Sequence, residues 1–363
     1  MSKQKELQPS IQKVLQEGVV IPAHPLALTN DLQLDEKRQR LLTRYYIASG
    51  AGGVAAGVHT TQFEIRKPGI NLLEPVLKIV ADEIEKAELK FPFIKVAGIC
   101  GPTDSAIQEA ELAIKYGYHL GLVSMGGLAY YSEAKLLKHA ITIAETIPVF
   151  GFYLQPAVGG RLLSYEFWRE FAEIPNVYAI KVAAFSRYQT LDVVRAVCNS
   201  SRRDEIALYT GNDDNIVADL LTPYQFMISG EKVEKRFVGG LLGHWAVWTK
   251  SAEELFAEIK HCIANNYAGV EKLLAKGIEV TDMNAVIFDA KNSFHGCIPG
   301  IHEVLRRQGL LENISCLNPE EKLSPGQMEE IDRLYKNYPH LMDDEFAKRF
   351  LENDKRINLS LAG

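Results

Sequence analysis

Short apolar runs alternate with longer amphipathic stretches over most of this chain, and no other feature of the sequence restricts the fold as strongly. Eight of the runs are almost continuously apolar, as strands are when both faces of a parallel sheet are buried. Strands that alternate with helices build parallel sheets, because each helix carries the chain back along the sheet. The predicted strands are residues 19–28, 53–59, 94–99, 119–123, 148–153, 177–182, 206–209 and 237–242.

The amphipathic stretches between these runs have the apolar spacing of helices that pack on one side. The predicted helices are residues 34–49, 71–88, 103–116, 132–145, 164–173, 187–199 and 251–265. Eight strand–helix units favour a closed (β/α)8 barrel, the TIM barrel, over a doubly wound open sheet. Residues 223–236 are longer and more charged than the seventh unit requires, so we expect an inserted loop there.

The strand pattern stops after residue 265. The helical stretches beyond it are residues 269–275, 285–307, 325–337 and 344–353. A barrel of this type needs about 250 residues, so the 363-residue chain has room for a barrel and an extension. We predict a catalytic barrel over residues 1–265 and a helical C-terminal extension, residues 266–363, packed on it.

Charge and cysteine content restrict the partners and the compartment. The formal net charge is −6 without a block of Lys or Arg, which argues against nucleic acid or an anionic membrane surface as the main partner. The five cysteines are scattered without a CxxC pair, a pattern typical of reduced thiols in a cytoplasm. The polar start of the chain and the absence of a long apolar run argue against a secretory signal and a membrane span.

Lys181 is the candidate nucleophile. It lies in the apolar segment 176–185, on the sixth predicted strand. An ammonium among such residues is partly desolvated, which favours the neutral amine. Lowering a lysine pKa by about three units costs about 4 kcal/mol, and this cost is tolerated mainly where the free amine is a nucleophile. The structural alternative is a lysine at a strand end whose ammonium reaches water.

Two further groups follow strand ends, at the edge where barrel enzymes place their catalytic residues. Tyr153 ends the fifth predicted strand, and a phenol there could move a proton to and from a carbinolamine. The turn His59-Thr60-Thr61-Gln62 follows the second strand, and its hydroxyls and N–H groups could hold a carboxylate. The alternatives are an aromatic residue that packs in the core and a loop with helix-capping threonines.

The order and spacing of these residues resemble a known family. Tyr153-Leu154-Gln155-Pro156 matches its Tyr-x-x-Pro motif, and Ala179-Ile180-Lys181 matches the strand that carries its Schiff-base lysine. His59-Thr60-Thr61 is similar to its carboxylate loop, and Gly211-Asn212-Asp213-Asp214 to its Gly-Asp-Asp turn. The chain resembles the dihydrodipicolinate synthase / N-acetylneuraminate lyase family of class I aldolases, as a divergent member.

The resemblance implies that Lys181 forms an imine with a 2-keto acid, so that neither a metal nor an organic cofactor is required. It also implies a homo-oligomer, a dimer or a tetramer. The predicted catalytic residues are Lys181, Tyr153 and Thr60. The predicted substrate-binding residues are His59, Thr61, Gln62, Gly211, Asn212 and His244.

The chain departs from the family at two places. Gly126-Gly127-Leu128 stands where the family has Pro-Tyr-Tyr, whose tyrosine completes a proton relay across a subunit contact. Val158 stands where dihydrodipicolinate synthases have an arginine for the second substrate's carboxylate, and Arg161 follows three residues later. These departures argue against aspartate semialdehyde as the substrate. They leave His59 or His244 to replace the missing tyrosine or to bind the substrate's tail.

A metal site is the rival hypothesis. His24, His59 and His244 fall near strands one, two and eight, which are neighbours in a closed barrel, and Asp213 and Asp214 lie just past strand seven. Three imidazoles and a carboxylate on one rim suit a divalent metal ion and a metal-dependent hydrolase or lyase. The sequence has no HxH or HExxH pair, so this hypothesis is the weaker one.

The sequence therefore predicts a cytoplasmic Schiff-base-forming lyase, an aldolase or hydro-lyase. It would act through Lys181 on a pyruvate-like 2-keto acid or a keto-deoxy sugar acid. Its predicted partners are this small-molecule substrate and copies of itself. The alternatives are a catalytically silent relative that binds a keto or sugar acid, which the missing Pro-Tyr-Tyr motif favours, and the metal-dependent enzyme.

Overall fold

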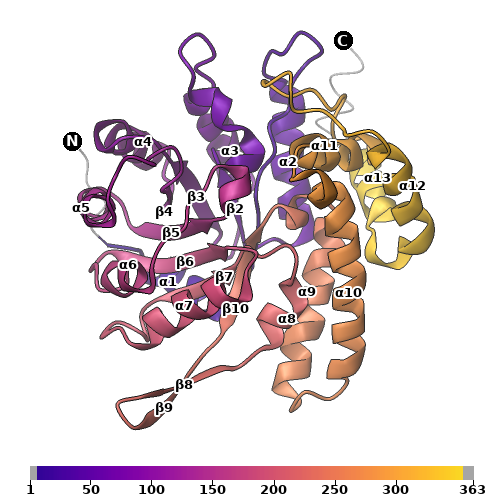
Figure 1. Cartoon of the computed structure of the whole chain (residues 1–363). Helices are drawn as coiled ribbons and strands as arrows, with labels where there is room; N and C mark the ends of the chain where they lie inside the picture. Colours follow the sequence, from indigo (N-terminus) through magenta and orange to yellow (C-terminus); the bar gives the residue numbers. More distant parts are fainter. Residues whose placement is uncertain (1–5, 355–363) are drawn as a thin grey trace.

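Eight parallel strands form the centre of the structure, a computed structural model that describes residues 6–354 (Figure 1). The strands are β1 (Val20–Pro22), β2 (Gly53–Ala56), β3 (Ile94–Ile99), β4 (Leu120–Ser124), β5 (Val149–Leu154), β6 (Val177–Ala183), β7 (Ala207–Thr210) and β10 (Phe237–Leu242). Their order is β1-β10-β7-β6-β5-β4-β3-β2. The ring closes where Ala23, just after β1, bridges Ala55 of β2. The predicted (β/α)8 barrel is confirmed.

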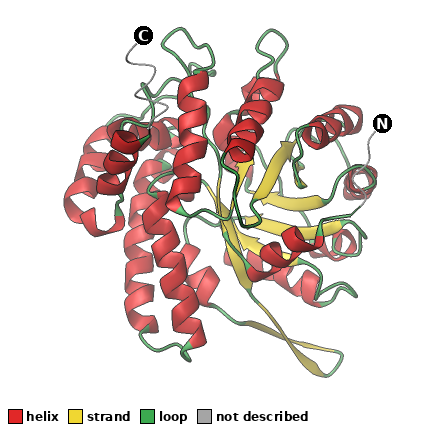
Figure 2. Ribbon diagram, turned by 180° about the vertical axis from the view of Figure 1, so that it is seen from behind, coloured by secondary structure: helices red, strands yellow, loops and turns green. Residues whose placement is uncertain are grey.

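Helices surround the barrel and lie close to the predicted ranges (Figure 2). Up to residue 264 they are α1 (Pro9–Glu17), α2 (Glu36–Ser49), α3 (Leu73–Lys86), α4 (Thr103–Lys115), α5 (Glu133–Ala144), α6 (Tyr165–Phe171), α7 (Arg187–Cys198), α8 (Ile216–Leu221) and α9 (Thr249–Ala264). The short 3-10 helices are η1 (His59–Thr61), η2 (Phe63–Arg66), η3 (Pro156–Val158) and η4 (His244–Ala246). Sequence analysis missed α8, because its 6 residues are too few to show a helical period.

Local sequence explains where several of these helices begin. An Asp or Ser side chain at the N-cap accepts a hydrogen bond from the backbone N–H three residues later, which satisfies one of the unpaired donors of the first turn. The capping residues are Asp35 for α2, Ser132 for α5, Ser164 for α6 and Ser186 for α7. Each cap follows a barrel strand and its connecting loop, so these side chains mark where the chain turns back along the barrel.

The N-terminal end of the barrel is closed by α1. Leu7, Ile11 and Leu15 are buried against the apolar side chains that point into the barrel. The Tyr209 hydroxyl, from β7, donates a hydrogen bond to the Leu15 carbonyl oxygen at 2.9 Å. Because this end is filled, a ligand can reach the barrel interior only from the end where the strands terminate.

Neighbouring residues of a strand point to opposite sides of the barrel wall. In β6, Ala179 and Ala183 belong to the interior cluster, whereas Ile180 and Val182 pack outward under the helices. The register between β5 and β6 shifts by one residue near the start of the strands. Val149 pairs with Val177, but Phe150 pairs with Ala179, so Tyr178 is an extra residue in β6. All later pairs of the two strands are displaced by this residue.

The C-terminal extension is helical and packs along one side of the barrel, where Figure 1 shows it in orange and yellow. Its elements are α10 (Val270–Ile287), η5 (Ala290–Asn292), α11 (Cys297–Arg307), α12 (Gln327–Asn337), η6 (Pro339–Leu341) and α13 (Asp344–Asn353). No helix in residues 6–354 has the length and apolar character needed to cross a membrane. The domain division at residue 265 stays a prediction, and its outer ends, residues 1–5 and 355–363, lie outside the described residues.

Two predicted helices of the extension have wrong boundaries. The helix predicted at residues 285–307 is interrupted, because α10 ends at Ile287 and α11 begins at Cys297. The expected break after residue 275 does not occur, because α10 continues through Gly277 to Ile287. A Cβ atom on Gly277 would lie 2.9 Å from the Val217 Cβ of α8. Glycine therefore stands here because α10 and α8 approach closely, and not because the helix ends.

The inserted loop predicted at residues 223–236 is instead a β-hairpin. Strands β8 (Tyr224–Ile228) and β9 (Glu231–Lys235) pair antiparallel and project from the barrel in Figure 1. Ser229 and Gly230 connect them with positive φ angles of 50° and 87°, as a two-residue hairpin turn requires. The charged residues that indicated a loop belong to β9, where the side chains of Glu231, Lys232 and Glu234 are exposed.

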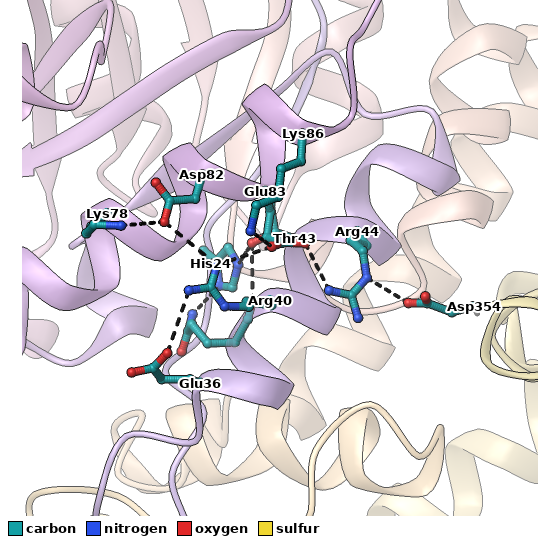
Figure 3. Close-up of polar contacts among 11 residues, drawn as sticks. His24, Glu36, Arg40, Thr43, Arg44, Lys78, Asp82, Glu83, Lys86 and Asp354 are labelled. Carbon is teal, nitrogen blue, oxygen red and sulfur yellow. Dashed lines mark hydrogen bonds and ion pairs between the residues drawn. The ribbon is translucent and has the colours of Figure 1, made fainter. Parts of the chain in front are cut away.

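A buried carboxylate joins α2 to α3 (Figure 3). Glu83 of α3 is 2% exposed, and its oxygens lie 2.9 Å from Arg44 and 3.2 Å from Arg40 of α2. Lys86 lies 3.3 Å from the same carboxylate. Burial opposes ionisation of Glu83, but the hydrogen bonds and charges of these three cations outweigh it and lower the pKa. Arg44 also pairs with Asp354 at 2.7 Å, which ties the end of the described chain to α2.

We expect Glu83→Gln to lower the free energy of unfolding by about 2–3 kcal/mol, because it removes the charge that two partly buried arginines share. Denaturant unfolding followed by circular dichroism measures the change. Asp82→Asn is the matched control on the same helix, since Asp82 pairs with the exposed Lys78 at 2.6 Å and with Arg40 only at 3.9 Å, and we expect it to cost less than about 1 kcal/mol. Equal midpoints for the two variants would contradict the assignment.

Candidate active site

A small cavity lies at the C-terminal ends of the barrel strands, with a volume of about 60 Å³. A single water needs about 10–15 Å³ on the same measure, so this space, the inner cavity, holds a molecule of several heavy atoms. Most of its wall is apolar. The polar side chains in the lining are His59, Thr60, Gln155, Lys181, Asp213 and Cys297.

Lys181 of β6 points into the inner cavity. It pairs in the sheet with Phe152 of β5, and its Nζ atom lies 4.4 Å from the centre of the Phe152 ring. The residue is 8% exposed. Burial lowers the pKa of the amine to about 8, against the opposing effect of the Asp213 charge. The neutral, nucleophilic amine is therefore more populated near neutral pH than it is at an exposed lysine.

Asp213 is the carboxylate that shares the cavity with Lys181. It lies in the turn after β7, and one of its oxygens accepts a hydrogen bond from the His244 backbone N–H at 3.0 Å. Burial raises the pKa of Asp213 to about 7, although this hydrogen bond and the Lys181 charge oppose the shift. No nitrogen–oxygen distance of 4.0 Å or less joins Lys181 to Asp213, both within the described residues. The two groups thus face one cavity without forming a closed ion pair.

Because residue 211 is a glycine, the turn that carries Asp213 can pack directly against the Lys181 side chain. A Cβ atom at position 211 would lie 2.5 Å from the Lys181 Cε atom. No larger residue fits without displacing the lysine. Gly211 lines the inner cavity, where it leaves room for Lys181, and its predicted contact with substrate stays a prediction.

Tyr153 does not reach the inner cavity. It pairs with Val182, and both residues point outward from the barrel. The Tyr153 ring lies 5.3 Å from the Trp168 ring of α6, and its hydroxyl accepts a hydrogen bond from the Leu163 N–H at 3.4 Å. In an unshifted register Tyr153 would stand opposite Lys181, so the extra residue Tyr178 separates them. This geometry does not support the predicted catalytic role of Tyr153.

The turn after β2 borders the cavity through His59 and Thr60. The hydroxyls of Thr60 and Thr61 donate hydrogen bonds to the Ala23 and His24 carbonyl oxygens at 2.8 and 2.7 Å. These two hydroxyls hold the turn to the end of β1. Carboxylate binding by this turn stays a prediction, and in this geometry it would fall to the backbone N–H groups and His59.

Besides Thr61, three predicted substrate-binding residues lie outside the inner cavity. Gln62 accepts a hydrogen bond from the Leu317 N–H at 2.6 Å, which fastens the extension to the barrel. The Asn212 side chain bonds to the Phe185 N–H and to Asp219. His244 contacts the cavity region only through its N–H bond to Asp213, and its ring lies 6.1 Å from the Trp248 ring. Each of these residues positions backbone and does not line the cavity.

The histidines of the metal hypothesis do not converge. The two ring nitrogens of His24 are used in hydrogen bonds to Pro25 or Gln39 and to Thr43. In residues 6–354 no group of three or more His, Cys, Asp or Glu side chains is arranged to hold a metal ion. The metal hypothesis therefore gains no support from this geometry.

The structure also shows where Val158 and Arg161 lie, the residues at and after the position of the family's arginine. Val158 lines the inner cavity. Arg161 donates hydrogen bonds to the Leu128 and Tyr131 carbonyl oxygens at 2.9 and 3.0 Å, so it braces the turn after β4. It does not take over the position of an arginine beside the substrate.

The residues that cover the outer end of the inner cavity, its roof, were not predicted from the sequence. Phe288, Phe294, Cys297 and Ile301 line it from the C-terminal extension. Nothing in the apolar pattern of these residues distinguishes them from ordinary helix-packing positions. They exclude water from Lys181, and burial also raises the pKa of the Cys297 thiol well above its ordinary value.

A second space, the outer chamber, of about 500 Å³, adjoins the inner cavity. The two share His59, Val158 and Phe294 in their linings, so these three residues, the neck, lie between the two spaces. Carboxylates and amides dominate the polar lining of the outer chamber: Glu64, Asn292, Asn318, Glu320 and Glu321. Burial raises the pKa of Glu321 to about 7, and the Glu64 charge adds to the shift.

Comparison with known proteins identifies the family. The sequence profile of the dihydrodipicolinate synthetase family matches residues 17–229, more than half of the chain. The chain belongs to this family. An N-acetylneuraminate lyase from Citrobacter koseri is 28% identical over 207 residues, which are 56% of this chain and 65% of that relative. The resemblance seen in the sequence is thereby confirmed, and the roof residues 288–301 lie beyond the family match.

Solved structures agree with the family fold. A dihydrodipicolinate synthase from Oceanobacillus iheyensis has a TM-score of 0.71 at 18% identity, over 91% of this chain and 98% of that one. An N-acetylneuraminate lyase from Fusobacterium nucleatum has a TM-score of 0.68 at 16% identity, over 91% and 100% of the two chains. At these identities the likeness shows the fold of the dihydrodipicolinate synthetase family and no specific activity.

We expect the reactivity of Lys181 toward acetic anhydride to reach half its maximum near pH 8. Burial disfavours the ammonium, so the reactive neutral amine accumulates as the pH rises through this lower pKa. Exposed lysines should titrate near pH 10.4. Competitive labelling read by peptide mass spectrometry measures both, and a Lys181 midpoint near that of the exposed lysines would disprove the assignment.

Proposed function

We propose that this protein is a lyase that forms a Schiff base between Lys181 and a 2-keto acid. The observation that carries the proposal is a buried amine, with its pKa lowered to about 8, that faces a small cavity at the C-terminal end of the barrel. This is the end where barrel enzymes hold their substrates. Membership of a family that includes an N-acetylneuraminate lyase relative supports the same reaction class.

The chemistry starts with the neutral amine. Its nitrogen lone pair attacks C2 of the keto acid, and the carbonyl oxygen takes up protons and leaves as water. The resulting iminium carries a positive charge beside C3, so it accepts the electron pair when a bond at C3 breaks. The imine itself is the electron sink, and the proposed reaction therefore uses neither a metal nor an organic cofactor.

In this proposal the substrate occupies both the inner cavity and the outer chamber. The inner cavity has room for a pyruvate-like end around Lys181, and the neck at Val158 leads the rest of the molecule into the outer chamber. The carboxylates of Glu64 and Glu320 repel a second acid group, and the oxygens of Glu64, Glu320 and Glu321 accept hydrogen bonds from hydroxyls. We therefore favour a 2-keto acid with a neutral, hydroxylated tail, such as a keto-deoxy sugar acid, over a dicarboxylic keto acid.

A catalytically silent relative that binds the same acid is the second candidate. The outward position of Tyr153 favours it, because the family motif then supplies no phenol to the cavity. The presence of Lys181 and Asp213 in one desolvated cavity favours the enzyme. We further propose a cytoplasmic homo-oligomer, a dimer or tetramer, on the basis of five unpaired cysteines and the family resemblance.

Incubation with pyruvate and borohydride should attach a reduced adduct to Lys181, detected by intact mass and by the modified peptide. The adduct should disappear in Lys181→Ala. Lys95→Ala is the matched control, because Lys95 also lies on a barrel strand and burial lowers its pKa, yet it does not line the cavity. Absence of an adduct from the folded wild-type protein with every 2-keto acid tried would refute the enzyme.

Val158→Trp should lower trapping of hydroxylated keto acids longer than pyruvate by about tenfold or more, a change of 1.4 kcal/mol. The indole narrows the neck between the two spaces, whereas pyruvate stays within the inner cavity and should be trapped within about threefold of wild type. Val158→Ala, which widens the neck, should trap both. Equal loss for pyruvate and the longer acids in Val158→Trp would show that the tail does not pass through this neck.

A further inference from the structure

The proton transfers of the proposed imine need an acid–base group in the inner cavity, and the family tyrosine does not supply it. The ionisable side chains in the lining are His59, Lys181, Asp213 and Cys297. Lys181 is consumed in the imine. Burial and neighbouring carboxylates raise the pKa of Cys297 well above neutrality, so its thiol is a poor base. His59 and Asp213 remain.

Asp213 is held in place for this task. The His244 N–H donates to one carboxylate oxygen at 3.0 Å, and within residues 6–354 the other oxygen accepts no hydrogen bond from another residue. The backbone two residues earlier, at Gly211, lies against the Lys181 side chain. The carboxylate and Lys181 both border the cavity and are not in ion-pair contact, so a substrate in the cavity is adjacent to both groups.

We propose that Asp213 is the acid–base residue that removes and returns the C3 proton of the Lys181 imine, a role that rests on the proposed function. The carboxylate takes the proton from C3, the C–H electron pair forms the C2–C3 double bond, and the iminium electron pair moves onto nitrogen. The products are a neutral carboxylic acid and a neutral enamine. Return of the proton to C3 regenerates the iminium and the carboxylate.

Charge balance favours Asp213 over His59 for this step. Transfer to a carboxylate converts a buried cation and a buried anion into two neutral groups, which a low-dielectric cavity favours. Transfer to the imidazole only moves the positive charge from the imine to His59. Burial and the nearby Lys181 charge already lower the pKa of His59 to about 4, which makes it a weak base.

The surroundings of Asp213 determine the direction of the pH dependence. The groups that face it are Lys181 on β6, Asp214 in the same turn, and Cys297 on α11. A positive iminium on Lys181 carries the same charge as the ammonium, so it continues to oppose the rise that burial causes in the pKa of Asp213. Lowering the pH protonates Asp213 and should remove the activity of this step.

Hydrogen–deuterium exchange at the pyruvate methyl group tests the proposal. The wild-type protein is incubated with pyruvate in D2O, methyl exchange is followed by proton NMR, and each rate is divided by the amount of borohydride-trapped adduct. We expect Asp213→Asn to lower this ratio by about 100-fold or more. Trapping itself should persist, and its pH midpoint should fall, because the Asp213 charge that raises the Lys181 pKa is gone.

Three further variants separate the alternatives. Asp214→Asn removes an exposed neighbouring carboxylate outside the cavity lining and should keep the wild-type ratio. An exchange ratio of Asp213→Asn within threefold of wild type overturns the proposal, and a large loss in Tyr153→Phe or His59→Gln would then identify the true base. Absence of any adduct in wild type would refute the proposed function itself.

The role of Asp213 can also be tested without the Asp213→Asn variant. If circular dichroism shows that Asp213→Asn is unfolded, the wild-type exchange per adduct is measured from pH 4 to pH 8. The ratio should fall as the pH is lowered and the carboxylate is protonated. A ratio that stays constant over this range overturns the assignment.

Discussion

The candidate site depends on one geometric constraint, the alternation of side chains between the two faces of a closed barrel. The side chain of a residue on a barrel strand points either into the interior or outward, where it packs under the helices. The register between β5 and β6 decides which side chains share a face with Lys181. Because Tyr178 is an extra residue in β6, Phe152 stands beside Lys181 and Tyr153 packs against Trp168.

Burial then gives the cavity its chemistry. The inner cavity is bounded below by the filled barrel and above by Phe288, Phe294 and Ile301 of the extension. Desolvation disfavours both charged forms, so the pKa of Lys181 falls to about 8 and the pKa of Asp213 rises to about 7. Their mutual attraction opposes both shifts. Two groups that are normally fixed in charge at neutral pH thereby become able to exchange protons.

The sequence predicted the strands well, because strands buried on both faces read as continuous apolar runs. Lys181 was found for the same reason, since a cation inside such a run is conspicuous. Asn212 and Gln62 were predicted from their place in the chain, but one bonds to Asp219 and the other to Leu317, and nothing local shows which way a turn residue points. The β8–β9 hairpin was missed because the exposed residues of β9 are charged.

The sequence by itself determined the alternation of strands and helices, the family motif, and the position of a desolvated lysine at a strand end. These are local properties, which depend only on the order of neighbouring residues in the chain. Tertiary structure alone decided that Tyr153 leaves the cavity, that Asp213 enters it, and that a segment around Phe294 roofs it. Each of these outcomes depends on a one-residue register shift or on a contact between distant segments. Pattern along the chain carries no information about either.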